Sequence, residues 1–231
     1  MLLLLVVSLV PGLLWVWFFY RQDRYEAEPR WLVIRAFWYG LLAVFPAALI
    51  ESYFQPFLHR PDSLVRLFLF TTAGVGLVEE VAKFTAAYLA VGSSPHFNEP
   101  MDGIVYTVAA GLGFAALENL FYTQVFGWGV APVRAVATSL AHASFSGIAG
   151  FYWGLGLLDA ARTRRFLARG LLYAVWWHGL YDWLVLGRLV SPGLTLALLF
   201  VIVAHLWIRI RTARRLSPFR PRPPEDGPLG S

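Results

Sequence analysis

The chain contains no cysteine among its 231 residues. This excludes disulfides, thiolate nucleophiles, and zinc or iron–sulfur centres that depend on cysteine ligands. Charge is also scarce, because 14% of the residues are charged while 58% are hydrophobic. A soluble chain carries about 25% charged and about 45–50% apolar residues. So few charges could not cover a water-facing surface, so the composition indicates a protein that lies largely in lipid.

Apolar segments long enough to cross a bilayer, which takes roughly 20 residues, recur along the chain. The sequence predicts an all-α polytopic membrane protein with about seven transmembrane helices, near residues 1–20, 36–54, 67–91, 103–124, 131–157, 170–187 and 193–209. We expect the first to be retained, because no basic residue precedes it and no A-x-A cleavage site follows. Residues 1–216 are expected to form one membrane-embedded domain. The Pro-rich residues 217–231 are expected to be a disordered tail, in which 227–231 resemble a cloning remnant.

Lysine is nearly absent, since Lys83 stands alone against eighteen arginines. If all seven segments span the membrane, fourteen arginines fall on one side, in residues 21–35, 158–169 and 209–222. Four fall on the other side: Arg60, Arg66, Arg134 and Arg188. The positive-inside rule then predicts an external N-terminus and a cytoplasmic C-terminus. We interpret the net charge of +5 as a topology signal and expect no nucleic-acid partner.

Ionisable residues lie inside four expected spans, where each costs about 2.5–3.5 kcal/mol on insertion scales. They are Glu79, Glu80 and Lys83, then Glu118, then His142, and finally His178 and Asp182. Residues four apart share a helix face, so Glu79 pairs with Lys83 and His178 with Asp182. Glu80 is rotated about 100° from Glu79, so the two carboxylates are not expected to reach one neighbour. The groups share a similar depth, which predicts a single polar site in the outer half of the bilayer.

This set of side chains suits the activation of water. A glutamate can act as general base while histidines and further acids bind a divalent metal or an oxyanion. The acids outnumber Lys83, so a metal or protonation must balance them. The candidate catalytic residues are Glu79, Glu80, Lys83, Glu118, His178 and Asp182. The candidate ligands, for a metal expected to be zinc, are Glu118, His142, His178 and Asp182, with Glu80 as a further possibility.

Three more residues near these groups are candidates for substrate binding: Phe114, Asn119 and Trp177. Structural roles stay open, since Phe114 also fits simple packing and Trp177 fits an interfacial anchor. His142 could form only an interhelical hydrogen bond. Glu51 and His205, near span ends, are expected to lie at the membrane interface.

The order of the motifs resembles a known family. Glu79-Glu80-x-x-Lys83, Phe114-x-x-x-Glu118 and His178-x-x-x-Asp182 are similar to the three signature motifs of the PrsW family of intramembrane proteases, over roughly residues 70–187. The resemblance implies a bacterial plasma-membrane enzyme, distantly similar to CAAX-processing and bacteriocin-immunity proteases. It also implies a metal-dependent first cut in a single-span anti-sigma factor, on its extracytoplasmic side. Neither H-E-x-x-H nor G-x-G-D occurs in the chain, so other intramembrane protease designs are disfavoured.

Three alternatives remain open at this point. Buried Glu, His and Lys also form the relays of proton- or cation-coupled transporters, although the sequence shows no repeated halves. A CAAX-type peptidase acting on prenylated proteins would use similar residues. A non-catalytic membrane scaffold is the third, and the sequence leaves the oligomeric state open.

Overall fold

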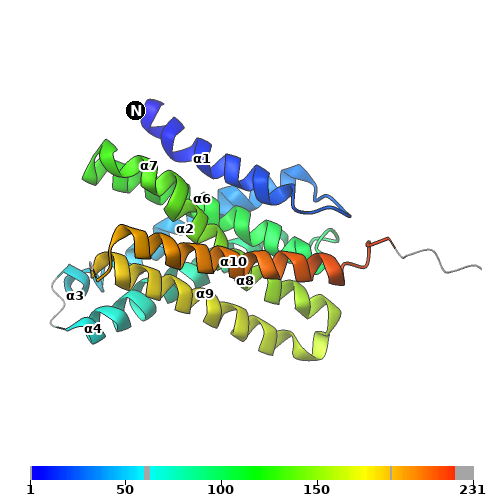
Figure 1. The fold of residues 1–231 in the computed structure, drawn as a ribbon. Coiled ribbons are helices and arrows are strands. Elements are labelled where there is room, and N and C mark those ends of the chain that lie inside the picture. Colours follow the sequence, from blue (N-terminus) through cyan, green and yellow to red (C-terminus); the bar gives the residue numbers. More distant parts are fainter. Residues whose placement is uncertain (1, 60–62, 188, 222–231) are drawn as a thin grey trace, which may run out of the picture.

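The structure is a computed structural model that describes residues 2–59, 63–187 and 189–221. Most of the predicted tail, including residues 227–231, lies outside the described residues. Within the described ranges every regular element is helical, which confirms the all-α class (Figure 1). The longer helices are α1 Leu2–Tyr20, α2 Arg30–Glu51, α5 Leu77–Val91, α6 Pro100–Phe126, α8 Ser139–Leu158, α9 Thr163–Leu186 and α10 Pro192–Leu216. The shorter elements are α3 Gln55–His59, α4 Leu64–Leu69, η1 Phe70–Gly76, η2 Trp128–Val130, α7 Ala131–Val133, η3 Arg134–Thr138 and η4 Ala160–Arg162.

Each expected span coincides with one continuous helical segment. The expected span 67–91 is α4, η1 and α5 in succession, and 131–157 is α7, η3 and α8. Three differences concern length, because α2 begins at Arg30 rather than near residue 36, α9 begins at Thr163 rather than near residue 170, and α10 continues past residue 209 to Leu216. Arginines at these ends are good helix formers, so the helices extend beyond their apolar parts.

Four of the described helices, α1, α2, α6 and α10, are long and apolar enough to cross a membrane by length and composition. Helix α5 is shorter, with 15 residues, and α8 and α9 carry the polar side chains discussed below. The chain is therefore a polytopic helical membrane protein. The count of seven spans and the orientation stay predictions.

Helix α6 is the central element of the bundle and packs against α1, α2, α5, α8 and α10. Small residues at every fourth position, Gly103, Thr107 and Gly111, face α8. A Cβ atom at Gly103 would lie 2.2 Å from the carbonyl oxygen of Gly150, so only glycine allows the helices to approach this closely. Small residues serve the same purpose in other membrane bundles. This packing holds the helix that carries Glu118 against the helix that carries His142.

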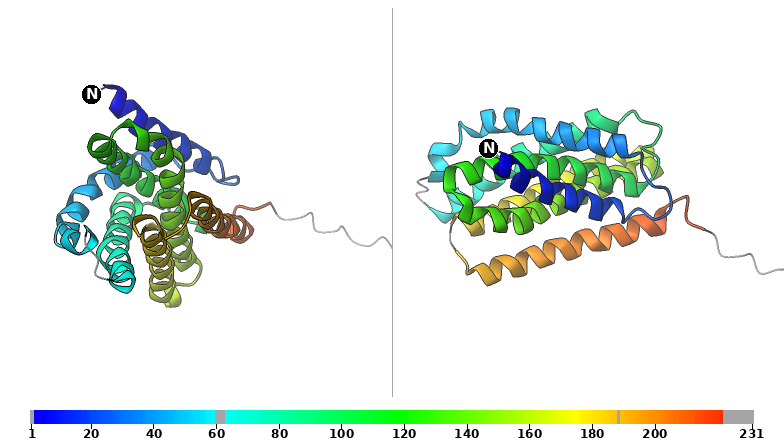
Figure 2. Two further views of the ribbon diagram at one scale, coloured as in Figure 1. Left: turned by 60° about the vertical axis from the view of Figure 1, so that its left-hand side comes forward. Right: turned by 90° about the horizontal axis from the view of Figure 1, so that it is seen from above.

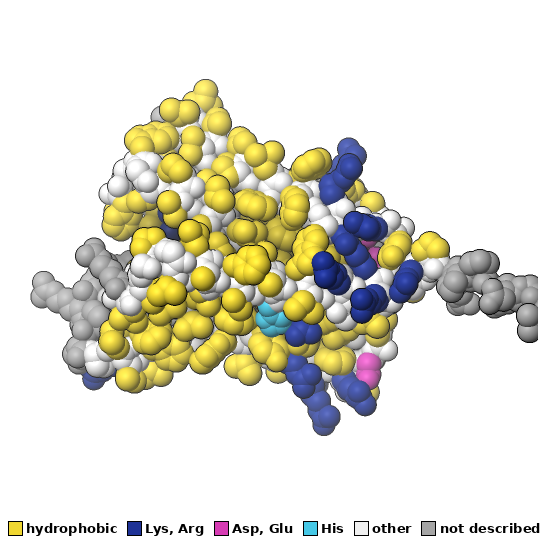
Figure 3. Space-filling view, in the orientation of Figure 1, with side chains coloured by type: hydrophobic (Ala, Val, Ile, Leu, Met, Phe, Trp, Pro, Cys, Tyr) yellow, Lys and Arg dark blue, Asp and Glu magenta, His cyan; other side chains and the backbone are white. Residues whose placement is uncertain are grey.

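The surface of the bundle separates into two zones. Large apolar side chains such as Phe200, Val125 and Leu172 are strongly exposed along its length, as expected for residues that face lipid. Most arginines gather at one end, where α1 and α10 finish (Figure 3). We call this the arginine-rich end. The long helices run side by side, with α10 at the edge of the bundle (Figure 2).

Candidate active site

Helix α5 contributes two glutamates and the lysine. The Lys83 Nζ atom lies 2.7 Å from Glu79 Oε2 and 2.9 Å from Glu80 Oε1, and all three side chains are buried. The expectation that the two carboxylates would not reach one neighbour is therefore wrong. Residues three and four positions away both adjoin Lys83 on the helix surface, and its long side chain rests between them.

Helix α8 brings His142 to the same lysine. Its Nδ1 lies 2.8 Å from Lys83 Nζ, and its Nε2 lies 3.2 Å from Glu118 Oε2 on α6. An ammonium group only donates hydrogen bonds, so Nδ1 accepts and Nε2 carries the hydrogen that faces Glu118. The ring of Phe114 lies 4.4 Å from Lys83 Nζ and stacks on His142. Phe114 thus packs against the charged groups from one side.

Helix α9 supplies the second imidazole, which carboxylates hold at both nitrogens. His178 Nδ1 lies 2.9 Å from Glu80 Oε1, and His178 Nε2 lies 3.3 Å from Asp182 Oδ2. The ring of Phe145 stacks on His178 with centroids 4.9 Å apart. The polar groups of four helices therefore meet at one place, as their similar depth predicts.

The carboxylate of Glu79 stands between the two imidazoles. Its Oε2 is 3.8 Å from His142 Nδ1 and 3.7 Å from His178 Nε2. One donor atom from each of these three residues lies within 4.8 Å of the other two. Two histidines and one glutamate are a common ligand set of catalytic zinc, and carboxylates that hold the histidines typically support such a set. This donor set therefore suits a divalent metal, which would have to replace the contact of Lys83 Nζ with His142 Nδ1.

The structure places the predicted ligands Glu118 and Asp182 beside the imidazoles, at His142 and His178 respectively. Their direct binding of a metal stays a prediction. Their side chains are also the more accessible ones, 17% and 23% exposed, whereas the side chains of Glu79 and Glu80 are 5% and 1% exposed. Water therefore reaches the site most readily from the side of Glu118 and Asp182. A crevice on the other side, near Glu80 and Ser146, is too tight for a water molecule.

Arg134 belongs to the site, although the sequence suggests only a cation outside the membrane. Its Nη2 lies 3.1 Å from Glu118 Oε1, and its guanidinium covers the ring of Tyr122 at 3.7 Å. Asn119 accepts a hydrogen bond of 2.9 Å from Arg134 Nε and donates one to Ser139 Oγ. The position of Arg134 at the start of an expected span, eight residues before His142, is the signal that could have found it.

Two further polar residues were missed by the sequence reasoning. Ser146 donates a hydrogen bond of 3.2 Å to Glu80 Oε2. Glu51, expected at the interface, has a buried Oε1 without a hydrogen-bond partner in the described structure, and it interacts electrostatically with Glu79 and Glu118. Serine is too common in membrane helices to stand out, and the sequence cannot show that the end of α2 lies near the glutamates of the site.

Trp177, one of the three candidates for substrate binding, makes its polar contact away from the glutamates. Its Nε1 donates a hydrogen bond of 3.0 Å to His205 Nδ1 on α10. Arg209 Nε lies 3.1 Å from the other ring nitrogen of His205, which cannot also accept once Nδ1 does, so the histidine joins α9 to α10 through Trp177. A role for Phe114, Asn119 or Trp177 in substrate binding stays a prediction.

Two π-helical turns adjoin the site and position its helices. The turn η1 immediately precedes α5, and η3 immediately precedes α8. Thr71 in η1 donates a hydrogen bond of 3.1 Å to the carbonyl oxygen of Gly179, the residue after His178. Such turns occur frequently at functional sites, where they adjust the direction of side chains.

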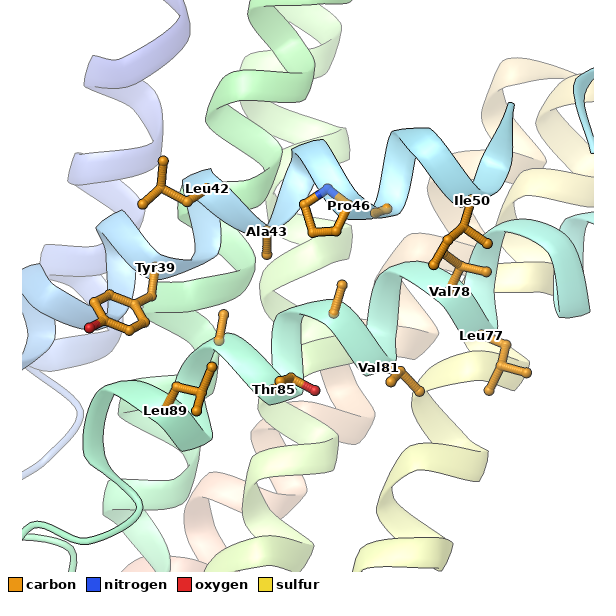
Figure 4. A pocket seen from close by; sticks show the side chains of 13 residues that line it. Tyr39, Leu42, Ala43, Pro46, Ile50, Leu77, Val78, Val81, Thr85 and Leu89 are labelled. Atoms are coloured by element: carbon orange, nitrogen blue, oxygen red, sulfur yellow. The ribbon is translucent and has the colours of Figure 1, made fainter. Parts of the chain in front are cut away.

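An apolar groove of about 670 Å³ runs between α2 and α5 (Figure 4). Its walls come from residues such as Leu42, Ile50, Val81 and Leu89, and Tyr39 and Thr85 add hydroxyl groups. Ala47 and Val78 in the floor belong to the same apolar cluster as Phe114. Phe114 in turn contacts Lys83 and His142, so it links the lining of the groove to the site.

The comparisons with known proteins agree with this site. A family model described as PrsW family intramembrane metalloprotease matches residues 28–208. The chain is 36% identical over 185 residues to Protease PrsW of Geobacillus kaustophilus, with 80% of each protein covered. It is 32% identical over 209 residues to Protease PrsW of Bacillus subtilis, covering 90% of this chain and 93% of the relative. No solved structure matches the chain.

A helical membrane protein with a buried site of this kind and these relatives is an intramembrane protease. The chain belongs to the PrsW family of intramembrane metalloproteases. Because the relatives are bacterial, the membrane that it crosses several times is the plasma membrane.

Proposed function

We propose that the protein hydrolyses a peptide bond in a single-span membrane protein and that Glu79 activates the attacking water. The observation that carries this assignment is the position of Glu79 Oε2 between the imidazoles of His142 and His178. The other oxygen, Oε1, makes no hydrogen bond to any described residue, so Glu79 can still accept a proton. A general base must reach its water directly in this way.

Glu80 is better suited to position other groups than to act as the base. Its Oε1 contacts both Lys83 and His178, and its Oε2 accepts a hydrogen bond from Ser146. With both oxygens occupied, Glu80 orients the ring of His178 and leaves Nε2 directed toward Glu79. Lys83 forms ion pairs of 2.7 and 2.9 Å with the two glutamates and so balances part of their charge.

Glu79, His142 and His178 would hold the divalent metal that the family description implies. A metal of this kind supplies a Lewis acid and lowers the pKa of water. For this purpose Glu118 orients His142 and Glu80 orients His178, and Arg134 fixes Glu118 in turn. Protons released during hydrolysis can leave through Glu118 and Asp182, whose side chains are partly exposed.

The groove between α2 and α5 suits the substrate's transmembrane segment. Its walls are almost entirely apolar, and its floor lies directly against Phe114 beside the charged groups. A helix that lies there and unwinds near α5 would bring a peptide bond next to Glu79. The predicted depth in the outer half of the membrane agrees with a cut on the extracytoplasmic side of an anti-sigma factor.

The catalytic assignment is tested with purified protein in detergent and a fluorescent single-span substrate. We expect Glu79→Gln to lower kcat by about 10³-fold, within the range that general bases contribute. Asp159→Asn is the matched control, because Asp159 lies at the surface in an ion pair with Arg162. Cleavage by Glu79→Gln at the rate of this control would contradict the assignment.

The same preparations separate the alternatives. Cleavage that requires a prenylated C-terminus would instead support a CAAX-type peptidase. Substrate-driven proton flux in liposomes, with no cleavage in any assay, would support a transporter.

The groove is tested independently by filling it. Val81→Trp places a large side chain in its wall, so we expect KM to rise about tenfold with kcat unchanged, since only substrate binding is affected. Val201→Trp on the exposed face of α10 is the matched control. Equal KM values for the two variants would place the substrate elsewhere.

A further inference from the structure

A second group of carboxylates lies far from the active site. Asp23 and Glu28 come from the linker between α1 and α2, and Asp102 comes from the first turn of α6. One oxygen of each lies within 4.8 Å of the other two, and their residues are 8%, 2% and 0% exposed. Asp102 precedes Glu118 by about 24 Å along α6 at 1.5 Å per residue, so the two groups are separate. This cluster lies at the arginine-rich end.

The oxygens of this cluster are incompletely satisfied. Neither oxygen of Asp23 has a hydrogen bond of standard geometry, and Asp102 Oδ1 also lacks one. Asp102 Oδ2 does accept hydrogen bonds of 2.7 Å from the amides of Asn98 and Glu99, and Glu28 accepts one from Tyr106. Asp23 is therefore buried beside other acids with only weak contacts to the amides of Tyr25 and Glu26, an arrangement that is costly without a cation.

No positive side chain fills this role in the described structure. None of its lysines or arginines has a nitrogen within 4.0 Å of these carboxylates. Arg214 comes close but binds the carbonyl oxygen and the side chain of Gln22, each at 2.7 Å. The described arginines and lysine thus leave these three carboxylates without a cationic partner.

We propose that Asp23, Glu28 and Asp102 together bind one hard divalent cation, Mg²⁺ or Ca²⁺. All three donors are oxygens, which these cations prefer, whereas the active site offers imidazole nitrogens that suit zinc. Ca²⁺ binds oxygen at about 2.3–2.6 Å, so two ligands on opposite sides of it lie up to about 5 Å apart. The spacing within the cluster fits this limit, and water can complete the shell.

The position of the cluster indicates what a cation would do there. It would join the linker between α1 and α2 to the first turn of α6. Helix α6 carries Phe114 and Glu118 to the active site, so the cation would hold this central helix in place. The role is structural and does not depend on the assignment of the catalytic base.

The test uses the full chain in detergent after removal of metals with a chelator. Thermal unfolding is followed with Mg²⁺, Ca²⁺ or Zn²⁺ added back. For the wild type we expect Mg²⁺ or Ca²⁺ to raise the unfolding midpoint by about 5 °C at a hundredfold excess over Kd. Asp23→Asn should abolish this shift. Glu79→Gln and Asp159→Asn should retain it, which separates the cluster from the active site and from surface effects.

Two outcomes would overturn the proposal. One is a wild-type midpoint that neither cation moves at about 10 mM, a concentration above the weakest calcium sites. The other is an equal shift in wild type and Asp23→Asn. Glu28→Gln, assayed by calorimetric titration with Ca²⁺ and Mg²⁺, provides a second variant if Asp23→Asn does not fold. Wild-type affinity in that variant would equally contradict the proposal.

Discussion

The protein has two clusters of carboxylates, one in the active site and one at the arginine-rich end, and their negative charge is balanced in different ways. In the active site Glu79 and Glu80 share Lys83, while Arg134 pairs with Glu118. At the arginine-rich end, the carboxylates of Asp23, Glu28 and Asp102 have no such partner within the described residues, although many arginines are near (Figure 3). A group surrounded by lipid must find its counter-charge within the protein, because the hydrocarbon core holds neither ions nor much water. A group at the end of the bundle can take an ion from the aqueous phase instead.

The largest expected effect comes from removing the shared cation of the active site. Lys83→Met should lower the free energy of unfolding by about 3–5 kcal/mol, because it leaves buried carboxylates without their partner. The measurement is unfolding in detergent followed by circular dichroism, together with the yield of folded protein. A loss below about 1 kcal/mol, the size of a surface pair, would show that other groups balance the glutamates.

A smaller effect is expected at the carboxylate that orients His178. Glu80→Gln should lower kcat about 10–100-fold, the usual consequence of losing such a partner. The amide oxygen can still accept the hydrogen bond from His178, so the loss should stay below that of Glu79→Gln. Single-turnover rates with saturating enzyme measure both variants. A greater loss of kcat for Glu80→Gln would indicate that Glu80 is the general base and that Glu79 positions other groups.

At the acid cluster of the arginine-rich end, removing a charge should change the free energy of unfolding in the opposite direction. In a chelator, Asp23→Asn should raise the free energy of unfolding by about 1 kcal/mol, because it removes a buried charge that lacks a partner. This is the reverse of the result for Lys83→Met, although each substitution removes one charge. Matched unfolding curves in EDTA give the comparison. A destabilised Asp23→Asn protein would show that the charge is already balanced without an ion.

The smallest effect on the free energy of unfolding is expected for an ion pair that is exposed to water. Arg162→Met breaks the exposed ion pair with Asp159 and should change the free energy of unfolding by no more than about 0.5 kcal/mol. Water screens the charges of such pairs, so neither a buried partner nor a bound ion is needed to balance them. Unfolding curves in the same detergent supply this reference, and a change above about 1 kcal/mol would question the burial argument used for the other two regions.

Part of the active site could be predicted from residue spacing alone. The pairs of Glu79 with Lys83 and of His178 with Asp182 follow from residues four apart on one helix, so they required no knowledge of packing. The contact of Glu80 with the same lysine was not predicted, because the rotation between Glu79 and Glu80 about the helix axis was considered without the reach of the lysine side chain. Arg134 and Ser146 could not be placed, since their contacts join different helices.

The sequence alone determined the helical class and the membrane setting, and it predicts that the polar groups lie at one depth. These properties depend on local composition and helical period, which lipid enforces on every span because backbone groups must be satisfied within the segment. The tertiary structure decided which nitrogen of each histidine faces which carboxylate, and that Glu79 rather than Glu80 keeps a free oxygen. It also decided that Asp23, Glu28 and Asp102, distant in sequence, share one buried place. Those outcomes depend on how glycine-lined helices approach one another, and no single helix contains that information.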